Sequence, residues 1–121
     1  MRNFKELDIW KQARTLTKQI YQLSATFPTN EQYGITSQIR RCVISIAANI
    51  AEGSAKSSEK DFARFLQISL GSAFELESHL ILCSDLEIIS DFEADNNIRP
   101  LQLLQKKLYS FVRYINAQSA P

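Results

Sequence analysis

Three basic side chains recur on one face of the first helix that the sequence predicts. Lys11, Arg14 and Lys18 fall at i, i+3 and i+7, and no acidic residue between positions 9 and 30 neutralises them. Such a row of cations can contact successive phosphates of a nucleic acid and release counterions. A solvated helix face has the same pattern, so both interpretations stay open. Second-rank candidates for phosphate contact are Arg41, Lys56 and Arg64.

A stripe of polar side chains occupies one side of the second predicted helix. Its members follow one another at three- and four-residue spacing and are Gln38, Arg41, Ser45, Asn49 and Glu52. Serine and asparagine are mediocre helix formers, so the stripe indicates a surface for a partner or for interhelical hydrogen bonds. A mixed polar face with no special role is the alternative.

The residues that could ligate a metal or act as a nucleophile are few. His79 is the one histidine, whereas a di-iron bundle needs two Glu-x-x-His sequences. Glu75 lies one helical turn from it, which favours a surface pair. Cys42 and Cys83 fall on apolar stripes of separate helices, where a free thiol behaves as a small hydrophobe, reacts poorly and does not complete a zinc site. With no glycine-rich phosphate loop, we expect no catalytic residue, metal, cofactor or small-molecule substrate.

Four segments with helical periodicity carry these residues. Their apolar side chains recur at three- and four-residue steps, as a buried helical face requires. Ser58 with Asp61 and Ser90 with Glu93 have the spacing of a helix-capping box. The expected helices, within one domain over residues 1–121, cover about residues 8–26, 36–53, 59–86 and 91–117. Amphipathic helices with short connections favour an all-α, antiparallel up-down four-helix bundle.

One residue conflicts with this pattern. Pro100 lies inside the last predicted helix, where it removes a backbone donor and its ring meets the carbonyl four residues earlier. We therefore expect a kink or a restart of the helix around Asn96 to Arg99.

The apolar stripes are wider than a single bundle core needs. A surface helix usually shows an apolar arc of somewhat over 100°, and three of the four predicted helices carry a second stripe beside the first. Either these residues widen the core, or they form an interface between copies of the chain. The oligomer-interface candidates are Trp10, Ile44, Ala47, Ala51, Leu70, Phe74, Ile81 and Ile88.

Charge and hydropathy exclude several classes of protein. The net charge is only +1, with ten basic against six acidic residues in positions 1–64 and four against seven in the rest. A dedicated nucleic-acid binder is far more basic. No apolar run approaches the roughly 20 residues that a membrane span needs, and the N-terminus lacks the pattern of a signal peptide. We expect a cytoplasmic protein that does not bind membranes.

Four stretches of the chain resemble a known family, that of the 23S ribosomal RNA intervening-sequence proteins. They keep their order and spacing over roughly residues 4–90 and read FKELDIWKQA, FPTNEQYGITSQIRR, SIAANIAEG and DFARFLQISLGSAFELESHL. The accessory variability determinants of diversity-generating retroelements are similar to the same family. The chain departs from the family pattern at Ala47, where many members have proline, and at Pro100.

The resemblance implies a four-helix bundle that assembles as a ring-shaped homopentamer and has no enzymatic activity. The retroelement relatives are strongly basic and bind nucleic acid and a reverse transcriptase, whereas this chain is nearly neutral. The resulting hypothesis is a non-catalytic, homo-oligomeric scaffold that binds RNA or a nucleoprotein. The alternative is a protein–protein adaptor that uses the polar stripe and binds no nucleic acid.

Overall fold

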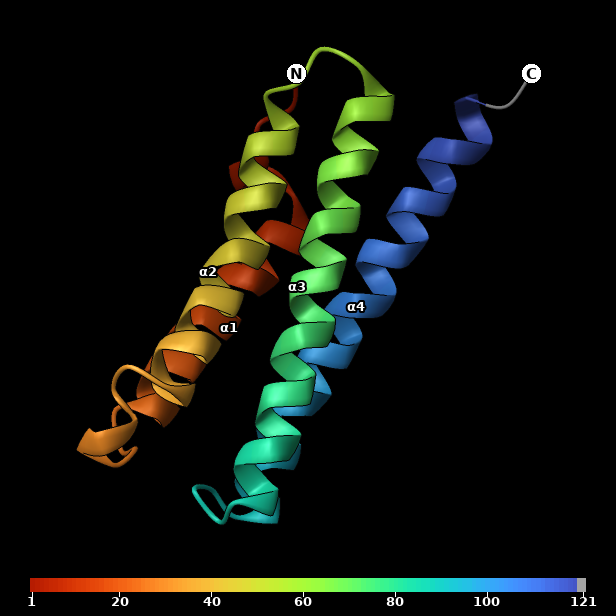
Figure 1. The fold of residues 1–121 in the computed structure, drawn as a ribbon. Helices are drawn as coiled ribbons and strands as arrows, with labels where there is room; N and C mark the ends of the chain where they lie inside the picture. Colours follow the sequence, from red (N-terminus) through yellow and green to blue (C-terminus); the bar gives the residue numbers. More distant parts are fainter. Residues whose placement is uncertain (120–121) are drawn as a thin grey trace.

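Four α-helices run alternately up and down in the computed structural model, which describes residues 1–119 (Figure 1). They are α1 (Asp8–Ser24), α2 (Ile35–Ser54), α3 (Glu59–Asp85) and α4 (Asp91–Ser119). Short 3-10 helices at Phe4–Glu6 and Thr29–Glu31 precede α1 and α2. The described residues contain no strand, so the predicted all-α up-down bundle is confirmed. The last two residues of the expected domain, 120 and 121, lie outside the described part of the chain.

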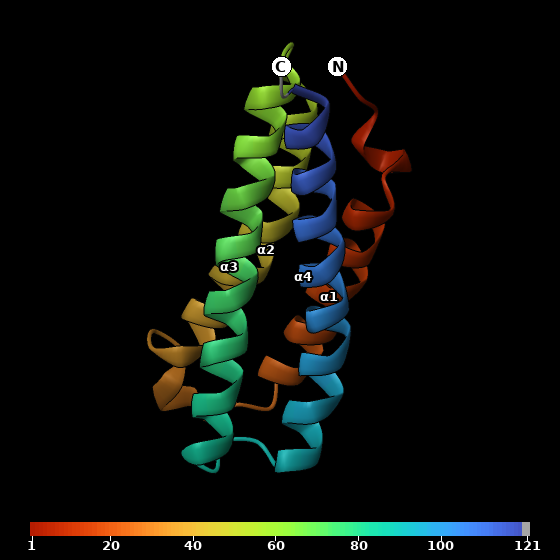
Figure 2. The ribbon, with the colours of Figure 1, turned by 90° about the vertical axis from the view of Figure 1, so that its right-hand side faces the viewer.

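Each helix packs against two of the others. α2 lies between α1 and α3, and α4 closes the bundle against α3 and α1. Figure 2 shows α3 and α4 side by side, with α2 and α1 behind them. Among the described residues, no helix is both long enough and apolar enough to cross a membrane.

The core consists of one apolar face from every helix. Burying one such side chain contributes about 1.5–3 kcal/mol. Cys42 and Cys83 are both free and fully buried, as their place on the apolar stripes predicts. The largest side chains with almost no exposed surface are Ile20, Ile39, Ile46, Ile50, Phe62, Leu66, Leu76, Leu80, Leu101, Leu104, Leu108 and Ile115.

Both predicted capping sequences stand at helix starts. The Ser90 hydroxyl accepts from the backbone N–H of Glu93 at 3.1 Å, and the Glu93 carboxylate accepts from the backbone N–H of Ser90 at 3.0 Å. This reciprocal pair is the full capping box. At α3 the Ser58 hydroxyl accepts from the N–H of Asp61 at 3.1 Å, while the Asp61 carboxylate pairs with Arg64 at 3.7 Å.

The expectation of a restart near Pro100 is wrong, because α4 is one uninterrupted helix from Asp91 to Ser119. A proline inside a helix costs roughly 3 kcal/mol. Ala94, Leu101 and Leu104 are buried on both sides of it, and their burial requires the two halves of the helix to remain in line. Tertiary packing therefore outweighs the local penalty. A kink in the helix axis here stays a prediction.

The segment before α1 is held across the turn that joins α2 and α3. The Arg2 guanidinium donates to both carboxylate oxygens of Glu59, at 2.5 and 2.6 Å, and lies 4.4 Å from the ring centre of Phe62. Its backbone N–H donates to the carbonyl of Ser54 at 2.9 Å. The contact lowers the pKa of Glu59, chiefly through the hydrogen bonds from Arg2.

The contact between α2 and α3 is closest at Gly53. A Cβ at this position would lie 2.7 Å from the Cβ of Phe65 and 3.2 Å from Cδ1 of Phe62. The shorter distance is one that real Cβ atoms do not adopt, and Cβ of Phe65 cannot move away without moving the backbone of α3. Gly71, by contrast, lies on the exposed side of α3, and an added Cβ there would meet nothing within 4 Å.

The two glycines form a matched pair of tests. Gly53→Ala should lower the free energy of unfolding by about 1–3 kcal/mol, because it overpacks the α2–α3 contact. Gly71→Ala should raise it by about 0.5–1 kcal/mol, because alanine is the better helix former and meets no obstacle. Urea denaturation followed by circular dichroism measures both. Equal effects of the two substitutions would show that α2 and α3 are not in close contact at Gly53.

Candidate functional site in the groove between α2 and α3

Four side chains that could carry chemistry meet along the line where α2 packs against α3, which we call the α2–α3 groove. Arg41 donates to Glu75 Oε2 at 2.5 Å, and its guanidinium lies 3.9 Å from Cys42 Sγ. His79 Nε2 lies 3.2 Å from the same Glu75 oxygen. One ligand atom each from Cys42, Glu75 and His79 lies within 4.8 Å of the other two. We call Cys42, Glu75 and His79 the α2–α3 cluster.

The surroundings of the cluster shift two of its pKa values in opposite directions. The pKa of Glu75 is lowered, first by its hydrogen bond with His79 and then by those with Cys42 and Arg41. The pKa of Cys42 is raised to about 12, first by burial and then by the neighbouring Glu75 carboxylate. At neutral pH the site therefore holds a carboxylate beside a protonated thiol. A protonated, fully buried thiol is a poor nucleophile.

The arrangement departs from the sequence analysis at His79. The predicted pairing with Glu75 is confirmed, but the histidine side chain is only 20% exposed and is therefore not on the open surface. Its Nδ1 is buried and has no hydrogen-bond partner among the described residues. Cys42 has no histidine near it in the sequence, whereas the structure places it with Glu75 and His79.

Predicting the cluster would have required the antiparallel register of α2 and α3, which brings Cys42 beside Glu75 and His79. Ser45 and Ser72 bond to each other at 2.9 Å, and one turn further along the groove Arg41 meets Glu75. Residue numbers therefore fall along α2 in the direction in which they rise along α3. Periodicity gives the face of each helix, but it does not give this register.

Most of the polar stripe on α2 is engaged inside the chain. Asn49 donates to the backbone carbonyl of Ser45 at 2.9 Å, and Arg41 donates to Gln38 at 2.7 Å. With the bonds from Ser45 and Arg41 to α3, four of the five members have partners. The Glu52 side chain is exposed and bonds to no other described residue.

The basic candidates form three separate groups. Lys11, Arg14 and Lys18 are exposed on the outer side of α1, and neither lysine forms an ion pair with a described residue. We call these three residues the α1 basic ridge. Arg14 lies 5.7 Å from the ring centre of Trp10. Arg41 belongs to the α2–α3 groove instead.

The third group lies at the turn between α2 and α3. Lys56 Nζ and Arg64 Cζ lie 5.0 and 4.8 Å from the ring centre of Phe65. The ring thus brings together two cations that are separated in the sequence. The three groups thus lie on different elements of the bundle.

The apolar interface candidates divide into core and surface. Four of them pack against the chain's own core, namely Trp10, Ala47, Leu70 and Ile88, and Ala51 is half-buried. Ile44 is 47% exposed. On α3, Phe74 is 56% exposed, and Ile81 and Leu82 are each 47% exposed. These three residues line a shallow groove together with Glu77 and Ser78, and we call them the α3 apolar strip.

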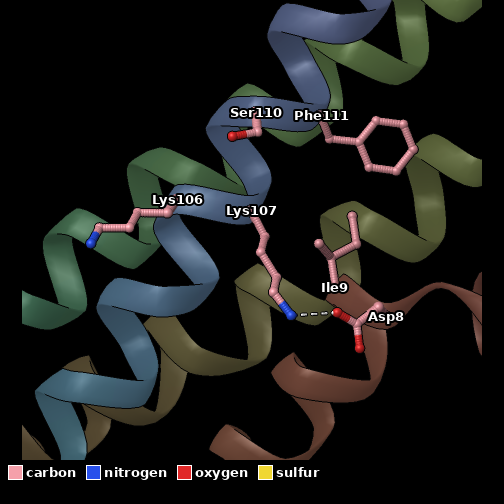
Figure 3. Close-up of a pocket in the computed structure, with 6 residues that line it drawn as sticks. All are labelled: Asp8, Ile9, Lys106, Lys107, Ser110 and Phe111. Atoms are coloured by element: carbon pink, nitrogen blue, oxygen red, sulfur yellow. Dashed lines mark hydrogen bonds and ion pairs between the residues drawn. The ribbon is translucent and has the colours of Figure 1, made fainter.

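A second groove lies between the start of α1 and α4 (Figure 3). Lys107 reaches across it and bonds to Asp8 at 2.6 Å, while Lys106 points away. The pKa of Asp8 is lowered, chiefly by the hydrogen bond from Lys107. Ile9 and Phe111 form the apolar wall. The negative charge of the Asp8 carboxylate is therefore balanced by Lys107. The described residues that line the groove include no nucleophile paired with a base.

Comparison with known proteins identifies a family and similar solved structures. A family model described as 23S rRNA-intervening sequence protein matches residues 5–110. A crystal structure of a protein of unknown function from the S23 ribosomal protein family of Bacteroides thetaiotaomicron is similar, with a TM-score of 0.79 and 29% sequence identity. The match covers 86% of this chain and 97% of that one. No curated protein matches the sequence.

The two buried thiols predict a loss of stability at alkaline pH. The pKa of Cys42 is raised to about 12 and that of Cys83 to about 11, both chiefly by burial. Between the pKa of an unfolded thiol, about 8.5, and these values, only the unfolded chain releases the protons. The free energy of unfolding should therefore fall as pH rises above about 9, by up to about 1.4 kcal/mol per pH unit for each thiol.

Urea denaturation at about pH 8 and about pH 10 measures this loss. The Cys42→Ser/Cys83→Ser double variant shows how much stability changes between the two pH values because of ionisable groups other than the thiols. The wild-type chain should lose more stability than the double variant between the two pH values. An equal loss would show that the thiols are accessible in the folded state. Both cysteines should also react slowly with thiol reagents below about pH 9.

Proposed function

We propose a scaffold function for this chain, which belongs to the 23S rRNA-intervening sequence protein family: it assembles with copies of itself and binds RNA or a nucleoprotein without catalysing a reaction. The proposal has two parts, an apolar contact between copies and a basic surface that the assembly repeats. Each part rests on its own residues and has its own test.

The α3 apolar strip is the observation that carries self-association. Phe74, Ile81 and Leu82 are large side chains that lie about half in water, although the bundle core beside them is fully buried. Contiguous apolar surface of this kind usually marks an interface. A second copy that covered the strip would bury this apolar surface. Each Å² removed from water would stabilise the contact by about 25 cal/mol. The family resemblance favours a closed ring of five copies.

The α1 basic ridge supports the nucleic-acid part. Its two lysines form no close ion pair with a described residue, and Lys11 interacts with the Asp8 carboxylate only through the Coulombic attraction that helps to lower its pKa. Binding a phosphate would therefore not require breaking an internal ion pair. The whole chain carries a net charge of only +1, and the attraction of one copy for RNA is therefore small. In a closed oligomer the ridge is repeated, and several weak contacts on one strand strengthen one another.

The engaged polar stripe favours nucleic acid over the adaptor function. A surface that recognises another protein needs free donors and acceptors, whereas Arg41, Ser45 and Asn49 already bond within the chain. Breaking these bonds would cost free energy, and this cost would offset much of the free energy gained from new hydrogen bonds to a partner. The adaptor function is nevertheless the conclusion if the intact oligomer binds neither RNA nor DNA at low salt.

Phe74→Glu should dissociate the oligomer without unfolding the chain. The new carboxylate stays in water in a free copy, because Phe74 is 56% exposed, but it would be buried without a partner in the interface. Analytical ultracentrifugation measures the mass, and circular dichroism checks the fold. Phe92→Glu is the matched control, since Phe92 is 73% exposed at the start of α4 and outside the strip. A wild-type chain that sediments as a monomer would contradict the proposal.

Replacing Lys11, Arg14 and Lys18 together with glutamine should weaken binding of single-stranded RNA and make it less dependent on salt. Each phosphate that a cation neutralises adds about 0.7 to the slope of log affinity against log salt, so the slope should fall by up to about two per chain that touches the strand. The effect should be similar for RNAs of different sequence, because phosphate contacts carry no base information. Fluorescence anisotropy at several salt concentrations measures both quantities.

The control for this variant changes the same net charge elsewhere. Lys60, Lys106 and Arg113 are exposed side chains on α3 and α4, and replacing them with glutamine also removes two lysines and one arginine. The control variant should keep most of the affinity. Equal weakening in both variants would mean that net charge, and not the α1 basic ridge, determines binding.

A further inference from the structure

We propose that the α2–α3 cluster binds a divalent transition-metal ion of the zinc type, through Cys42 Sγ, a carboxylate oxygen of Glu75 and the imidazole of His79. The inference does not depend on the proposed scaffold function. It rests on the geometry of the three side chains and on the chemistry of their donor atoms.

The three donors are spaced nearly as the ligands of one ion would be. Zinc–ligand bonds of about 2.0–2.3 Å place two ligands of a tetrahedral ion about 3.3–3.8 Å apart. His79 Nε2 and Glu75 Oε2 are already 3.2 Å apart, and all three donor atoms lie within 4.8 Å of one another. A small contraction would complete the spacing. Glu75 can supply it, because its side chain is 41% exposed and is held by polar contacts and not by core packing.

The donor types select the class of metal. A thiolate, an imidazole and a carboxylate together suit zinc and its neighbours, whereas calcium and magnesium prefer oxygen ligands alone. Binding forms a metal–sulfur bond, and the proton of the Cys42 thiol leaves to solvent. Three protein ligands leave a fourth tetrahedral position for water.

The two ring nitrogens of His79 have different surroundings. Its Nδ1 is buried and has no partner among the described residues, and proteins rarely leave buried polar atoms unsatisfied. His79 packs beside α2, against the groove that holds Cys42. Because Nε2 is the nitrogen that faces Glu75, it is the one that would bind the ion, with the proton of the neutral ring on Nδ1.

The positive charge of Arg41 opposes this site. It bonds to Glu75 Oε2 and lies near Cys42 Sγ, so it repels a metal ion. Its side chain is 56% exposed and can turn toward water. If it stays on one oxygen of Glu75, it orients the carboxylate for the metal, as hydrogen-bonded groups around metal ligands commonly do.

Titration of the reduced wild-type protein with cobalt(II) chloride tests the proposal. We expect one cobalt ion per chain, visible ligand-field bands of a tetrahedral ion and a near-ultraviolet charge-transfer band from a cobalt–thiolate bond. Added zinc chloride should displace the cobalt and bleach these bands. Zinc should also raise the melting temperature of the chain, because it binds the folded state.

Variants assign the site. Cys42→Ser should abolish the thiolate band, and Glu75→Gln and His79→Gln should each weaken cobalt binding at least about tenfold. Cys83→Ser is the matched control for the thiol, because Cys83 is equally buried and lies outside the cluster. Glu87→Gln is the control for the carboxylate. Both controls should bind cobalt as the wild type does.

Two results would overturn the proposal. One is the absence of a thiolate band at millimolar cobalt in the wild-type protein. The other is a weakening of the band in Cys83→Ser equal to that in Cys42→Ser. Circular dichroism shows whether each variant is folded. His79→Gln keeps the test decisive if Cys42→Ser does not fold, since His79 is not fully buried.

Discussion

Gly53 on α2 lies where any side chain would collide with Phe65 of α3, and much of the molecule depends on the close approach that it permits. Small residues continue the contact along the groove. Ser69 is fully buried and donates to the backbone carbonyl of Ile46 at 2.7 Å, and Ala73 is fully buried one turn further on. Because the two helices lie this close, short polar side chains such as Ser45 and Ser72 can bond directly across the groove.

The same approach creates the α2–α3 cluster. Cys42 is fully buried, yet it lies near a carboxylate and an imidazole because α3 passes directly beside it. At a wider helix separation, Arg41 and Glu75 would each be solvated, and His79 would keep both ring nitrogens in water. Close packing thus gives this groove its unusual electrostatics, a depressed carboxyl pKa next to a raised thiol pKa.

The three kinds of surface are distributed over different helices. The α1 basic ridge faces outward, the α2–α3 groove is polar and largely satisfied, and the α3 apolar strip is half-exposed. In a closed oligomer each surface would be repeated at regular intervals, so that one contact type holds the assembly and another faces a ligand. This separation allows the proposed assembly, nucleic-acid binding and metal binding to be tested by substitutions that do not overlap.

The sequence by itself determined everything that depends on local periodicity. The positions of the helices, their buried faces, the capping pairs at Ser58 and Ser90 and the burial of both cysteines follow from residues only a few positions apart. The local rule was misleading at Pro100, where burial of Leu101 and Leu104 keeps α4 continuous. Family membership also followed from the order of the segments along the chain.

Only the tertiary structure decided which faces meet and at what register. The capture of Arg2 by Glu59, the pairing of Arg41 with Glu75 and the meeting of Cys42 with His79 join residues that are far apart in the sequence. It also decided that Leu70 and Ile88 pack against the core while Phe74 and Ile81 remain about half in water. The physical reason is that periodicity gives the direction of a side chain around its own helix axis, whereas the distance and offset between helices depend on how all the side chains at their contacts fit together.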